Sequence, residues 1–417
     1  MKKGEVLGRA DLSVDFCGLK FENPFMLSSA PPTATWEMIR RAFDAGWGGV
    51  VAKTLGLEPT PNVRPRFAKL QFGEKEMAGF ENIELITDRP IEDWLPELEQ
   101  IKKDYPDKIL IASIMAEMAA DKWQELVKRV QETGVDAIEL NVSCPHGMPE
   151  RGMGAAIGQD PELTGKVVKW VKEVADVPVI AKMTPNVTDI TLIARAAEKN
   201  GADALSGINT VLSFMGVDLE TMEPKPSVNG MSAFGGGCGP SVKPIALRCV
   251  AQMAKSTKLP ISGIGGISTW RDAVEFMMVG ASTLQVCTAV MFRGYRIVKG
   301  LKSGLANYLA EKGFDSVKEV VGYILPKLTA LEKLDFTHRV VYEVDEDKCI
   351  RCGRCYVACL DGGYEAITLD EEGLATIDED KCDGCSLCYH VCPVWDCIKI
   401  KTMEKLSEPK VYRQKQG

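Results

Sequence analysis

The sequence predicts an α/β chain, with a (β/α)8 TIM barrel followed by a small, cysteine-rich α+β domain. Two observations lead to this fold class. Eight short apolar runs alternate with amphipathic helical patterns over residues 20–290, which is the element order of a barrel. Nine of the 14 cysteines lie within residues 349–397, so this segment differs in character from the rest of the chain.

Composition agrees with a large folded core. The 417 residues are 45% hydrophobic and 26% charged, with a net charge of −8, which argues against disorder, collagen or a coiled coil. The mild acidity gives no reason to expect nucleic acid or an anionic membrane as a partner. The sequence begins without an apolar signal region, and no run approaches 18 uncharged apolar residues. We therefore expect no membrane span and a cytoplasmic location, where thiols stay reduced.

The eight expected strands are nearly continuous apolar runs, as parallel strands covered on both faces should be. They are residues 24–28, 48–54, 108–114, 136–142, 177–183, 203–209, 259–265 and 282–288. The expected helices between them are 36–45, 92–104, 121–133, 161–175, 189–200, 243–257 and 269–280. Asp121 and Thr269 are candidate N-caps, and Gly46 is a candidate helix stop. A doubly wound sheet is the alternative, but eight repeats favour a barrel.

Polar residues and glycines follow the strands at their carboxyl ends, where a barrel places its chemistry. They are Ser29, Ala30, Lys53, Thr54, the run 141–144, Lys182, Asn209, Thr210, Gly265, Gly266, Cys287 and Thr288. Each one alone is also compatible with a solvated strand end. Three long loops, 56–90, 143–160 and 211–242, follow strands at the same end, and long loops in compact domains are usually functional or mobile.

The pattern divides the chain into four parts. Residues 1–295 form the barrel, and residues 296–340 form a helical cap or connector with helices over 296–312 and 316–333. Residues 341–400 form the cysteine-rich domain, and residues 401–417 form a polar tail.

The cysteine-rich domain repeats a C-x2-C-x2-C-x3-C spacing. The cysteines are Cys349, Cys352, Cys355 and Cys359, then Cys382, Cys385, Cys388 and Cys392, the last followed by Pro393. This is the pattern of bacterial ferredoxins with two [4Fe–4S] clusters, in which the fourth cysteine of each run binds the other cluster. One cluster would then use Cys349, Cys352, Cys355 and Cys392, and the second the remaining four. Two four-cysteine zinc sites are the alternative, although these usually come as separated C-x2-C pairs.

A ferredoxin domain carries single electrons, so we expect a flavin in the barrel to convert them to hydride chemistry. The glycines after the seventh strand suit a phosphate site, and Lys182 would lie beside the flavin N1. Cys144, in a polar N-V-S-C-P-H run, is a candidate proton donor, with an inert buried thiol as the alternative. No G-x-G-x-x-G or P-loop follows a strand, so NAD and FAD are expected on a partner subunit.

Several motifs resemble the pyrimidine-reducing part of the dihydropyrimidine dehydrogenase family. They are NVSCPHGMPERGMG, AKMTPNVTDI, INTV, GPSVKPIALR and LQVCTAV, followed by the ferredoxin motif, and the likeness runs over about residues 12–400. Size and order look like the bacterial NAD-dependent form, in which this is one subunit. The fold is similar to that of dihydroorotate dehydrogenase, whose loop shares the S-C-P core. Pro149 departs from the family, where a glycine is expected.

The resemblance implies the site residues. FMN would be bound by Ser29, Ala30, Lys53, Thr54, Lys182, Gly239, Gly265, Gly266, Cys287 and Thr288. Uracil or thymine would be bound by Asn82, Asn141, Val142, Ser143, Asn209 and Thr210. Electrons would pass from NADH, through a partner with FAD in a heterotetramer, to the two clusters and then to FMN. Hydride would go to C6 and the Cys144 proton to C5.

Two other functions stay open. One is a dihydroorotate dehydrogenase-like oxidoreductase of another cyclic amide, in which a cation would meet the orotate carboxylate. The other is a non-catalytic electron-transfer subunit that uses the barrel as a scaffold. Assays with uracil, thymine and orotate side by side, together with a test for bound flavin, distinguish these functions.

Overall fold

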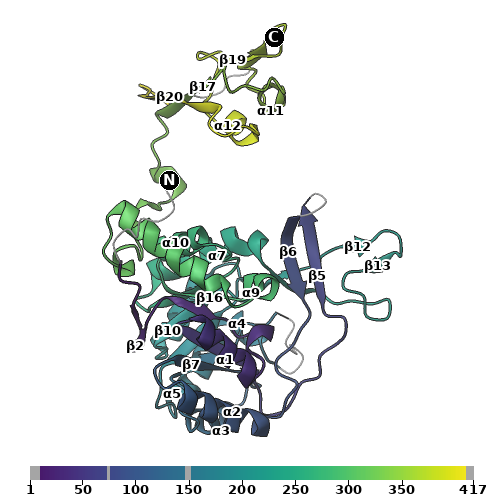
Figure 1. Ribbon diagram of the computed structural model, residues 1–417, viewed down its shortest axis with the longest axis vertical. Coiled ribbons are helices and arrows are strands. Elements are labelled where there is room, and N and C mark those ends of the chain that lie inside the picture. Colours follow the sequence, from purple (N-terminus) through teal and green to yellow (C-terminus); the bar gives the residue numbers. More distant parts are fainter. Residues whose placement is uncertain (1–9, 73–75, 146–151, 410–417) are drawn as a thin grey trace. The chain divides into compact units, whose positions relative to one another are not determined.

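The computed structural model describes residues 10–72, 76–145 and 152–409. The chain divides into two compact units, and the boundary falls between Lys327 and Leu328. Figure 1 labels many of the elements described below. In the part of the chain that the structure describes, no helix is long and apolar enough to cross a membrane.

Eight parallel strands close into a barrel in the first unit, in the order β3-β4-β7-β8-β9-β10-β15-β16. Their bounds are β3 Phe25–Leu27, β4 Gly49–Leu55, β7 Ile109–Ile114, β8 Ala137–Leu140, β9 Val179–Met183, β10 Ala204–Gly207, β15 Ile261–Ile264 and β16 Ala281–Val286. Closure is made by the last strand, whose Leu284 pairs with Phe25 of the first. The predicted barrel is therefore confirmed, and an open doubly wound sheet is excluded.

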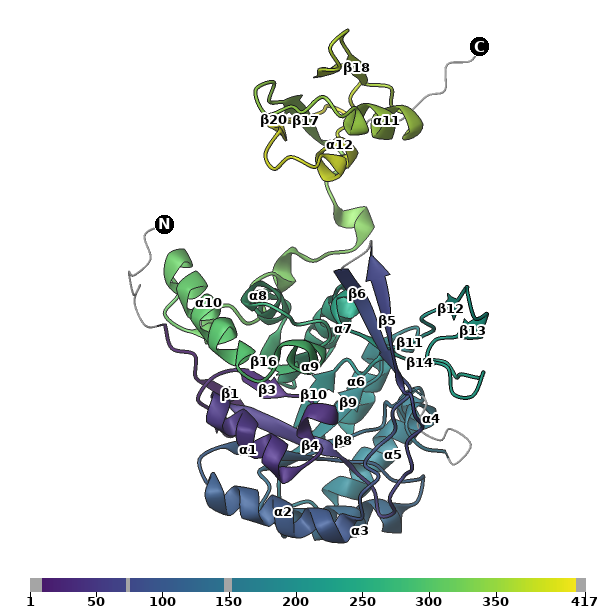
Figure 2. The ribbon, with the colours of Figure 1, turned by 45° about the vertical axis from the view of Figure 1, so that its right-hand side comes forward.

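Helices surround the strands, as Figure 2 shows for α1, α2, α3 and α5. They are α1 Trp36–Ala45, α2 Ile91–Asp104, α3 Ala120–Gln131, α5 Pro161–Lys172, α6 Ile190–Lys199, α7 Lys243–Ser256 and α8 Trp270–Met278. Each buries one apolar stripe against the strands; α1, for example, buries Ile39, Ala42 and Phe43. Thr269 caps α8 through a reciprocal bond pair with Asp272, as its position predicts. Asp121 is instead in the first turn of α3, whose N-cap is Ala119.

The amino-terminal end of the barrel is covered by a short hairpin of β1 Val14–Phe16 and β2 Leu19–Phe21. Phe16 and Phe21 are almost fully buried. A Cβ added to Gly49, the first residue of β4, would lie only 2.6 Å from the Phe21 ring. The hairpin therefore seals the apolar core at this end, and the opposite, carboxyl end is left for the site.

The long loops at that carboxyl end are not irregular. β5 Phe67–Phe72 and β6 Glu76–Asn82 form a hairpin, and β11 Val211–Ser213 and β14 Gly235–Cys238 join it in one antiparallel sheet of order β11-β14-β6-β5. Gly236 pairs with both Asn82 and Leu212. A second small pair, β12 Val217–Asp218 and β13 Glu223–Pro224, extends from the same loop (Figure 2). The sheet links two loops that are more than a hundred residues apart in sequence.

Three further helices complete the first unit: α4 Ala155–Gly158, α9 Thr288–Arg293 and α10 Ile297–Lys312. The helix α10 matches the expected 296–312. The second expected helix, 316–333, is not formed, since the segment contains only the short 3-10 turns Val317–Glu319, Leu325–Lys327 and Leu331–Lys333. Gly322 with φ +77° and the following Pro326 interrupt any longer helix there.

The second unit is a small α+β fold. Strand β17 His338–Val344 pairs with β20 Ile398–Lys405, and β18 Ile367–Leu369 pairs with β19 Ala375–Ile377. Helices α11 Arg354–Asp361 and α12 Leu387–Val391 carry cysteines of the two repeats. β20 continues to Lys405, so the first residues of the expected tail 401–417 belong to a strand instead. The polar composition of this segment suggested a tail, but its backbone pairs with β17.

Candidate active site

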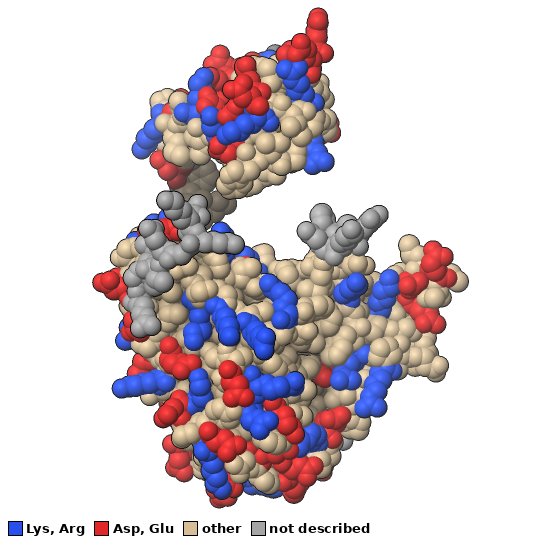
Figure 3. Space-filling view, viewed as in Figure 1, with Lys and Arg blue, Asp and Glu red and all other residues tan. Residues whose placement is uncertain are grey.

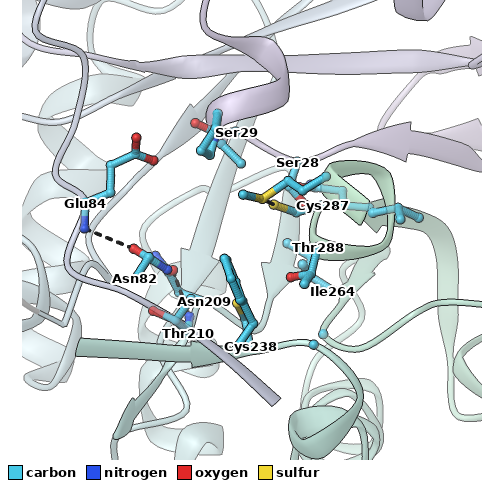
Figure 4. A pocket seen from close by; sticks show the side chains of 18 of the residues that line it. Ser28, Ser29, Asn82, Glu84, Asn209, Thr210, Cys238, Ile264, Cys287 and Thr288 are labelled. Atoms are coloured by element: carbon cyan, nitrogen blue, oxygen red, sulfur yellow. Dashed lines mark hydrogen bonds between the residues drawn. The ribbon is translucent and has the colours of Figure 1, made fainter. Parts of the chain in front are cut away.

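One pocket lies at the carboxyl ends of the barrel strands, and it encloses about 1110 Å³ including its open mouth. Because this volume includes solvent at the mouth, it lies slightly above the range of about 300–1,000 Å³ for small-molecule sites. All ten residues expected to bind the cofactor line it: Ser29, Ala30, Lys53, Thr54, Lys182, Gly239, Gly265, Gly266, Cys287 and Thr288. Four of the six expected substrate residues, Asn82, Asn141, Asn209 and Thr210, line it as well. Figure 4 shows Asn82, Asn209 and Thr210 on one side, and Ser28, Cys287 and Thr288 on the other.

The loops after β15 and before α7 form a cradle of bare backbone. Gly239, Gly265 and Gly266 have φ values of +81°, +128° and +78°, which favour glycine. A Cβ on Gly266 would lie 2.8 Å from the Gly239 carbonyl oxygen and 3.1 Å from the Lys243 backbone nitrogen. The missing side chain therefore lets the two loops pack against each other, and their main chain lines the pocket, as in the phosphate-binding loops after the last barrel strands.

Two buried polar atoms of the pocket have no hydrogen-bond partner among the described residues. They are the Ser28 hydroxyl and the Gln285 Oε1, and both residues line the pocket. Buried polar groups are nearly always satisfied, so these two point to a ligand with its own donors and acceptors. The polar ring edge of FMN offers both, and its phosphate suits the glycine cradle. The residues present therefore fit FMN.

Two buried lysines line the pocket, and each is paired with a carboxylate. The Lys53 ammonium is 2.8 Å from Glu84 Oε2, and the Lys182 ammonium is 3.2 Å from Glu139 Oε1. Both lysines are less than a tenth exposed, and burying an isolated ammonium is costly without such a partner.

A cluster of amides and hydroxyls makes the polar wall. Asn209 Nδ2 donates to Asn141 Oδ1 at 3.2 Å and to Ser143 Oγ at 2.8 Å. Asn141 Nδ2 donates to Thr54 Oγ1 at 3.0 Å. Ser143 itself does not line the pocket, and its contribution is to orient Asn209. The wall is thus held by bonds among residues from several strands, which fixes where its amide groups face.

Asn82 reaches the same pocket from the β5–β6 hairpin. Its Nδ2 donates to the Gly236 carbonyl at 3.2 Å, and its Oδ1 accepts from the Glu84 backbone N–H at 3.3 Å (Figure 4). The sheet between the two loops therefore places this amide on the same side of the pocket as Asn209 (Figure 4).

Val142, expected among the substrate residues, is placed differently. Its side chain is fully buried in the barrel core, just beyond the end of β8, where the chain turns and the Val142 N–H donates to the Leu140 carbonyl at 3.0 Å. Cys144 lines the pocket, is 9% exposed and packs with Ile86, Met115 and Met153. His146 and Pro149 lie outside the described residues.

Sequence reasoning missed several pocket residues, above all Glu84. Its carboxylate joins Lys53 to Arg66, whose Nε is 3.0 Å from Glu84 Oε1. A signal existed, since Glu84 lies two residues after Asn82 in the same loop. Ser28, Gln285 and Cys238 were also missed, because each looked like part of an apolar strand or a glycine run.

The remaining pocket thiols are strongly desolvated. Burial raises the pKa of Cys287 to about 12 and that of Cys238 to about 11. Neutral thiols are therefore the resting form of both at ordinary pH, and they add no negative charge beside a bound cofactor.

The cysteines of the second unit surround two separate hollows. Cys349, Cys352, Cys355 and Cys392 line one hollow, and Cys359, Cys382, Cys385 and Cys388 line the other. The hollows enclose about 360 and 350 Å³. Among the described residues, no three potential ligands converge tightly enough for a single metal ion. Four sulfurs around a hollow suit a cube of iron and sulfide, and each hollow takes its fourth cysteine from the other repeat, as the spacing predicts.

The chain belongs to the dihydroorotate dehydrogenase family. The family model "Dihydroorotate dehydrogenase" matches residues 11–309, and the model "4Fe-4S dicluster domain" matches residues 342–400. This combination defines an oxidoreductase with a barrel of the FMN-binding type and an iron–sulfur domain.

Particular relatives narrow the comparison. The chain is 48% identical over 365 residues to the NAD-dependent dihydropyrimidine dehydrogenase subunit PreA of Escherichia coli K12, covering 87% of this chain and 88% of that one. It is 46% identical to the chloroplastic dihydropyrimidine dehydrogenase (NADP(+)) of Arabidopsis thaliana, covering 82% and 83%. It is 43% identical to the catalytic subunit of dihydroorotate dehydrogenase B of Pyrococcus abyssi, covering 75% and 99%.

A solved structure shows the same fold. The crystal structure of a DHODH of Eimeria tenella with ferulenol superposes with a TM-score of 0.64 at 23% identity, covering 75% of this chain and 88% of that one. At that identity the likeness concerns the barrel fold alone.

Proposed function

We propose that this chain reduces uracil and thymine to their 5,6-dihydro forms. FMN would occupy the barrel pocket, and two [4Fe–4S] clusters would occupy the hollows of the second unit. The relatives named dihydropyrimidine dehydrogenase support this assignment, and so does the pocket. We place the reaction in the cytoplasm, where the cysteines stay reduced.

The observation that carries the proposal is the match between the pocket wall and a neutral pyrimidine. A uracil ring alternates N–H donors and carbonyl acceptors along its edge. Asn82, Asn141 and Asn209 each offer both kinds of group, and they face the pocket from separate elements. A site built to pair buried polar groups in this way rejects rings that lack them.

The charges of the pocket separate this proposal from its nearest alternative. Orotate carries a carboxylate that needs a cation. The two lysines that line the pocket are each bound to a carboxylate, Lys53 to Glu84 and Lys182 to Glu139. A neutral ring suits such a wall better than an anion.

In the reaction, the chain's own residues bind the ring, exclude water and hold a proton. The asparagines would fix the ring plane, and Lys182 would hold positive charge beside the cofactor. When bound, FMN supplies the hydride for pyrimidine C6. Cys144, packed among Ile86, Met115 and Met153, would hold its thiol proton for C5. Two single electrons per turnover would arrive through the clusters, so the net change is the addition of one hydride and one proton.

NADH would be oxidised elsewhere. We propose a partner subunit that binds NAD and FAD, together with this chain in a heterotetramer. The word "subunit" in the name of the Escherichia coli relative supports a partner. The absence of a dinucleotide fingerprint after any strand of this sequence agrees with it.

A substrate panel tests the function. The anaerobically purified chain, with its flavin and iron quantified, is supplied with a reduced viologen dye and with uracil, thymine or orotate. We expect turnover of uracil and thymine and at least a hundredfold lower kcat/KM for orotate. Preferred turnover of orotate would support the dihydroorotate dehydrogenase alternative, and a chain without bound flavin would support the electron-transfer subunit.

A further inference from the structure

A fully buried carboxylate lies beneath the cofactor pocket, on the barrel axis. Glu139 of β8 is 0% exposed and accepts three hydrogen bonds from three other strands. Its Oε1 is 3.2 Å from the Lys182 ammonium of β9, and its Oε2 accepts from Ser206 Oγ of β10 at 2.8 Å and from Gln285 Nε2 of β16 at 3.0 Å. Because β16 lies on the opposite side of the barrel from β8, this carboxylate joins the two walls.

The first consequence concerns charge. Lys182 lines the pocket, whereas Glu139 does not, so only the ammonium faces the cofactor. An unpaired ammonium 4% exposed would act as a full positive charge in a medium of low dielectric constant. With Glu139 in contact, the pair is neutral as a whole, and a bound ring meets a dipole in place of an isolated cation.

The second consequence concerns an amide. The Gln285 amide nitrogen is turned toward Glu139, because a carboxylate only accepts hydrogen bonds. Its carbonyl oxygen is left without a partner among the described residues, in a residue that lines the pocket. Glu139 therefore determines that Gln285 presents an acceptor, which suits a ring N–H.

From these contacts we propose that Glu139 is a positioning residue that sets the redox potential of the bound flavin. Its carboxylate offsets the Lys182 charge and directs the Gln285 carbonyl toward the ring. This inference rests on the proposed function, since it takes FMN as the occupant of the pocket. Reduction adds negative charge to the ring, and a lone cation would favour the reduced form strongly. Glu139 weakens that preference, so the reduced cofactor remains a strong donor.

The test is Glu139→Gln in the full-length chain, which keeps the size of the side chain and removes its charge. The dissociation constants of oxidised and of reduced FMN are measured with the apoprotein. We expect the ratio of the dissociation constant of oxidised FMN to that of reduced FMN to rise at least tenfold above its wild-type value. This corresponds to a positive shift of about 30 mV in the potential of the bound flavin, taken as a two-electron couple. An unchanged ratio would overturn the proposal.

A matched control is available in Glu81→Gln. Glu81 is also 0% exposed, but it accepts from Ser213 at 2.7 Å and does not line the pocket. The same chemical change there should leave the ratio within threefold of the wild type. A shift as large as that of Glu139→Gln would mean that replacing any buried carboxyl group has this effect, which would contradict the specific role of Glu139.

The double variant Glu139→Gln/Lys182→Gln keeps the proposal testable even if the single variant does not fold. It removes both charges, and replacing a buried pair with neutral groups is often tolerated. We expect its ratio to return to within threefold of the wild type. A tenfold fall in this ratio would show that the positive charge of Lys182 is not offset in the wild type, which would refute the role of Glu139. A wild-type chain that binds no FMN would instead refute the proposed function.

Discussion

Cys144 differs from the other pocket residues in that it is expected to give up a proton in each turnover. The thiol lies in the pocket wall among apolar neighbours. That placement suits a proton donor held near the substrate and away from bulk water. The sequence predicted this residue from its polar N-V-S-C-P-H context, because a thiol between an amide-rich strand end and a proline does not look like core.

We predict that Cys144→Ala lowers the kcat for uracil by about 10²–10⁴-fold, the usual effect of losing a general acid, while FMN content persists. Steady-state assays with a reduced dye and the flavin absorbance measure the two quantities. Cys249→Ala is the control, since this cysteine is also fully buried but lies on α7 in the apolar core. Unchanged turnover of the Cys144 variant would remove its assigned role.

The other two pocket thiols give a prediction for pH. Burial raises the pKa of Cys287 to about 12 and that of Cys238 to about 11. Since only the thiolate reacts with iodoacetamide, a raised pKa means less reactive thiolate at any given pH. In the flavin-free chain we expect both to resist labelling at pH 8, with rates rising about tenfold per pH unit over the alkaline range in which the chain stays folded. Peptide mass mapping measures the rates.

The control for this labelling is the chain in denaturant, where a cysteine recovers an ordinary pKa of about 8.5 and should react quickly at pH 8. Equally fast labelling of the folded chain at that pH would contradict the expected desolvation of the two thiols.

Residue-scale prediction failed where a side chain acts through a distant partner. Glu84 looked like an ordinary loop acid until the fold brought it to Lys53 and Arg66. Glu139 and Gln285 stood within apolar strands, and nothing in the sequence indicated that they meet on the barrel axis. Val142 was included with its neighbours Asn141 and Ser143, but its side chain lies in the core.

At the scale of elements, the backbone cradle at Gly266 is the feature most open to test. Its φ of +78° and the close approach of Gly239 and Lys243 leave no room for a side chain. The cradle depends on two loops meeting and on no single motif. The sequence could therefore show only that glycines cluster there.

We predict that Gly266→Ala raises the dissociation constant of FMN at least tenfold, since its Cβ would lie 2.8 Å from the Gly239 carbonyl oxygen and separate the loops. Fluorescence titration of the apoprotein with FMN measures the effect. Gly230→Ala is the matched control, because Gly230 has a similar φ of +82° but nothing within 4 Å of an added Cβ. Equal losses in both variants would show that backbone strain alone is responsible.

Most elements were predictable because their signals are local. Each expected barrel strand overlaps an observed one, and the covering helices begin within two residues of the expected positions. The prediction of a helix over residues 316–333 was wrong because helical periodicity was given more weight than Gly322 and Pro326. The β11-β14-β6-β5 sheet could not be foreseen, since its pairing depends on the closed barrel bringing the two loops together.

At the scale of the whole molecule, the cysteine-rich part of the second unit is acidic. Residues 341–400 contain 14 Asp and Glu against 5 Lys and Arg, and Figure 3 shows acidic side chains gathered on the visible face of this unit. The repeated cysteine spacing predicted the domain and the division of its cysteines between two hollows. Sequence could not indicate where its charges would gather.

We predict that the isolated chain reduces uracil with a reduced dye but not with NADH. Adding a flavoprotein partner that binds NAD and FAD should restore NADH-dependent turnover. Because an acidic surface attracts a basic partner mainly through long-range charge, the restored rate should fall several-fold between about 50 and 500 mM salt, while the dye-driven rate changes little. Stopped-flow and steady-state assays measure both rates. Robust NADH turnover by the chain alone would contradict the need for a partner.

The sheet shared by the two long loops has a consequence for how this pocket can change. Asn82 and Gly236 are hydrogen-bonded neighbours in that sheet, so an insertion within β6 or β14 changes which residues of the two loops pair. An attempt to transplant substrate preference from a relative would fail if it moved one loop alone. The smallest exchangeable piece of this pocket is the pair of loops taken together, although they lie far apart in the gene.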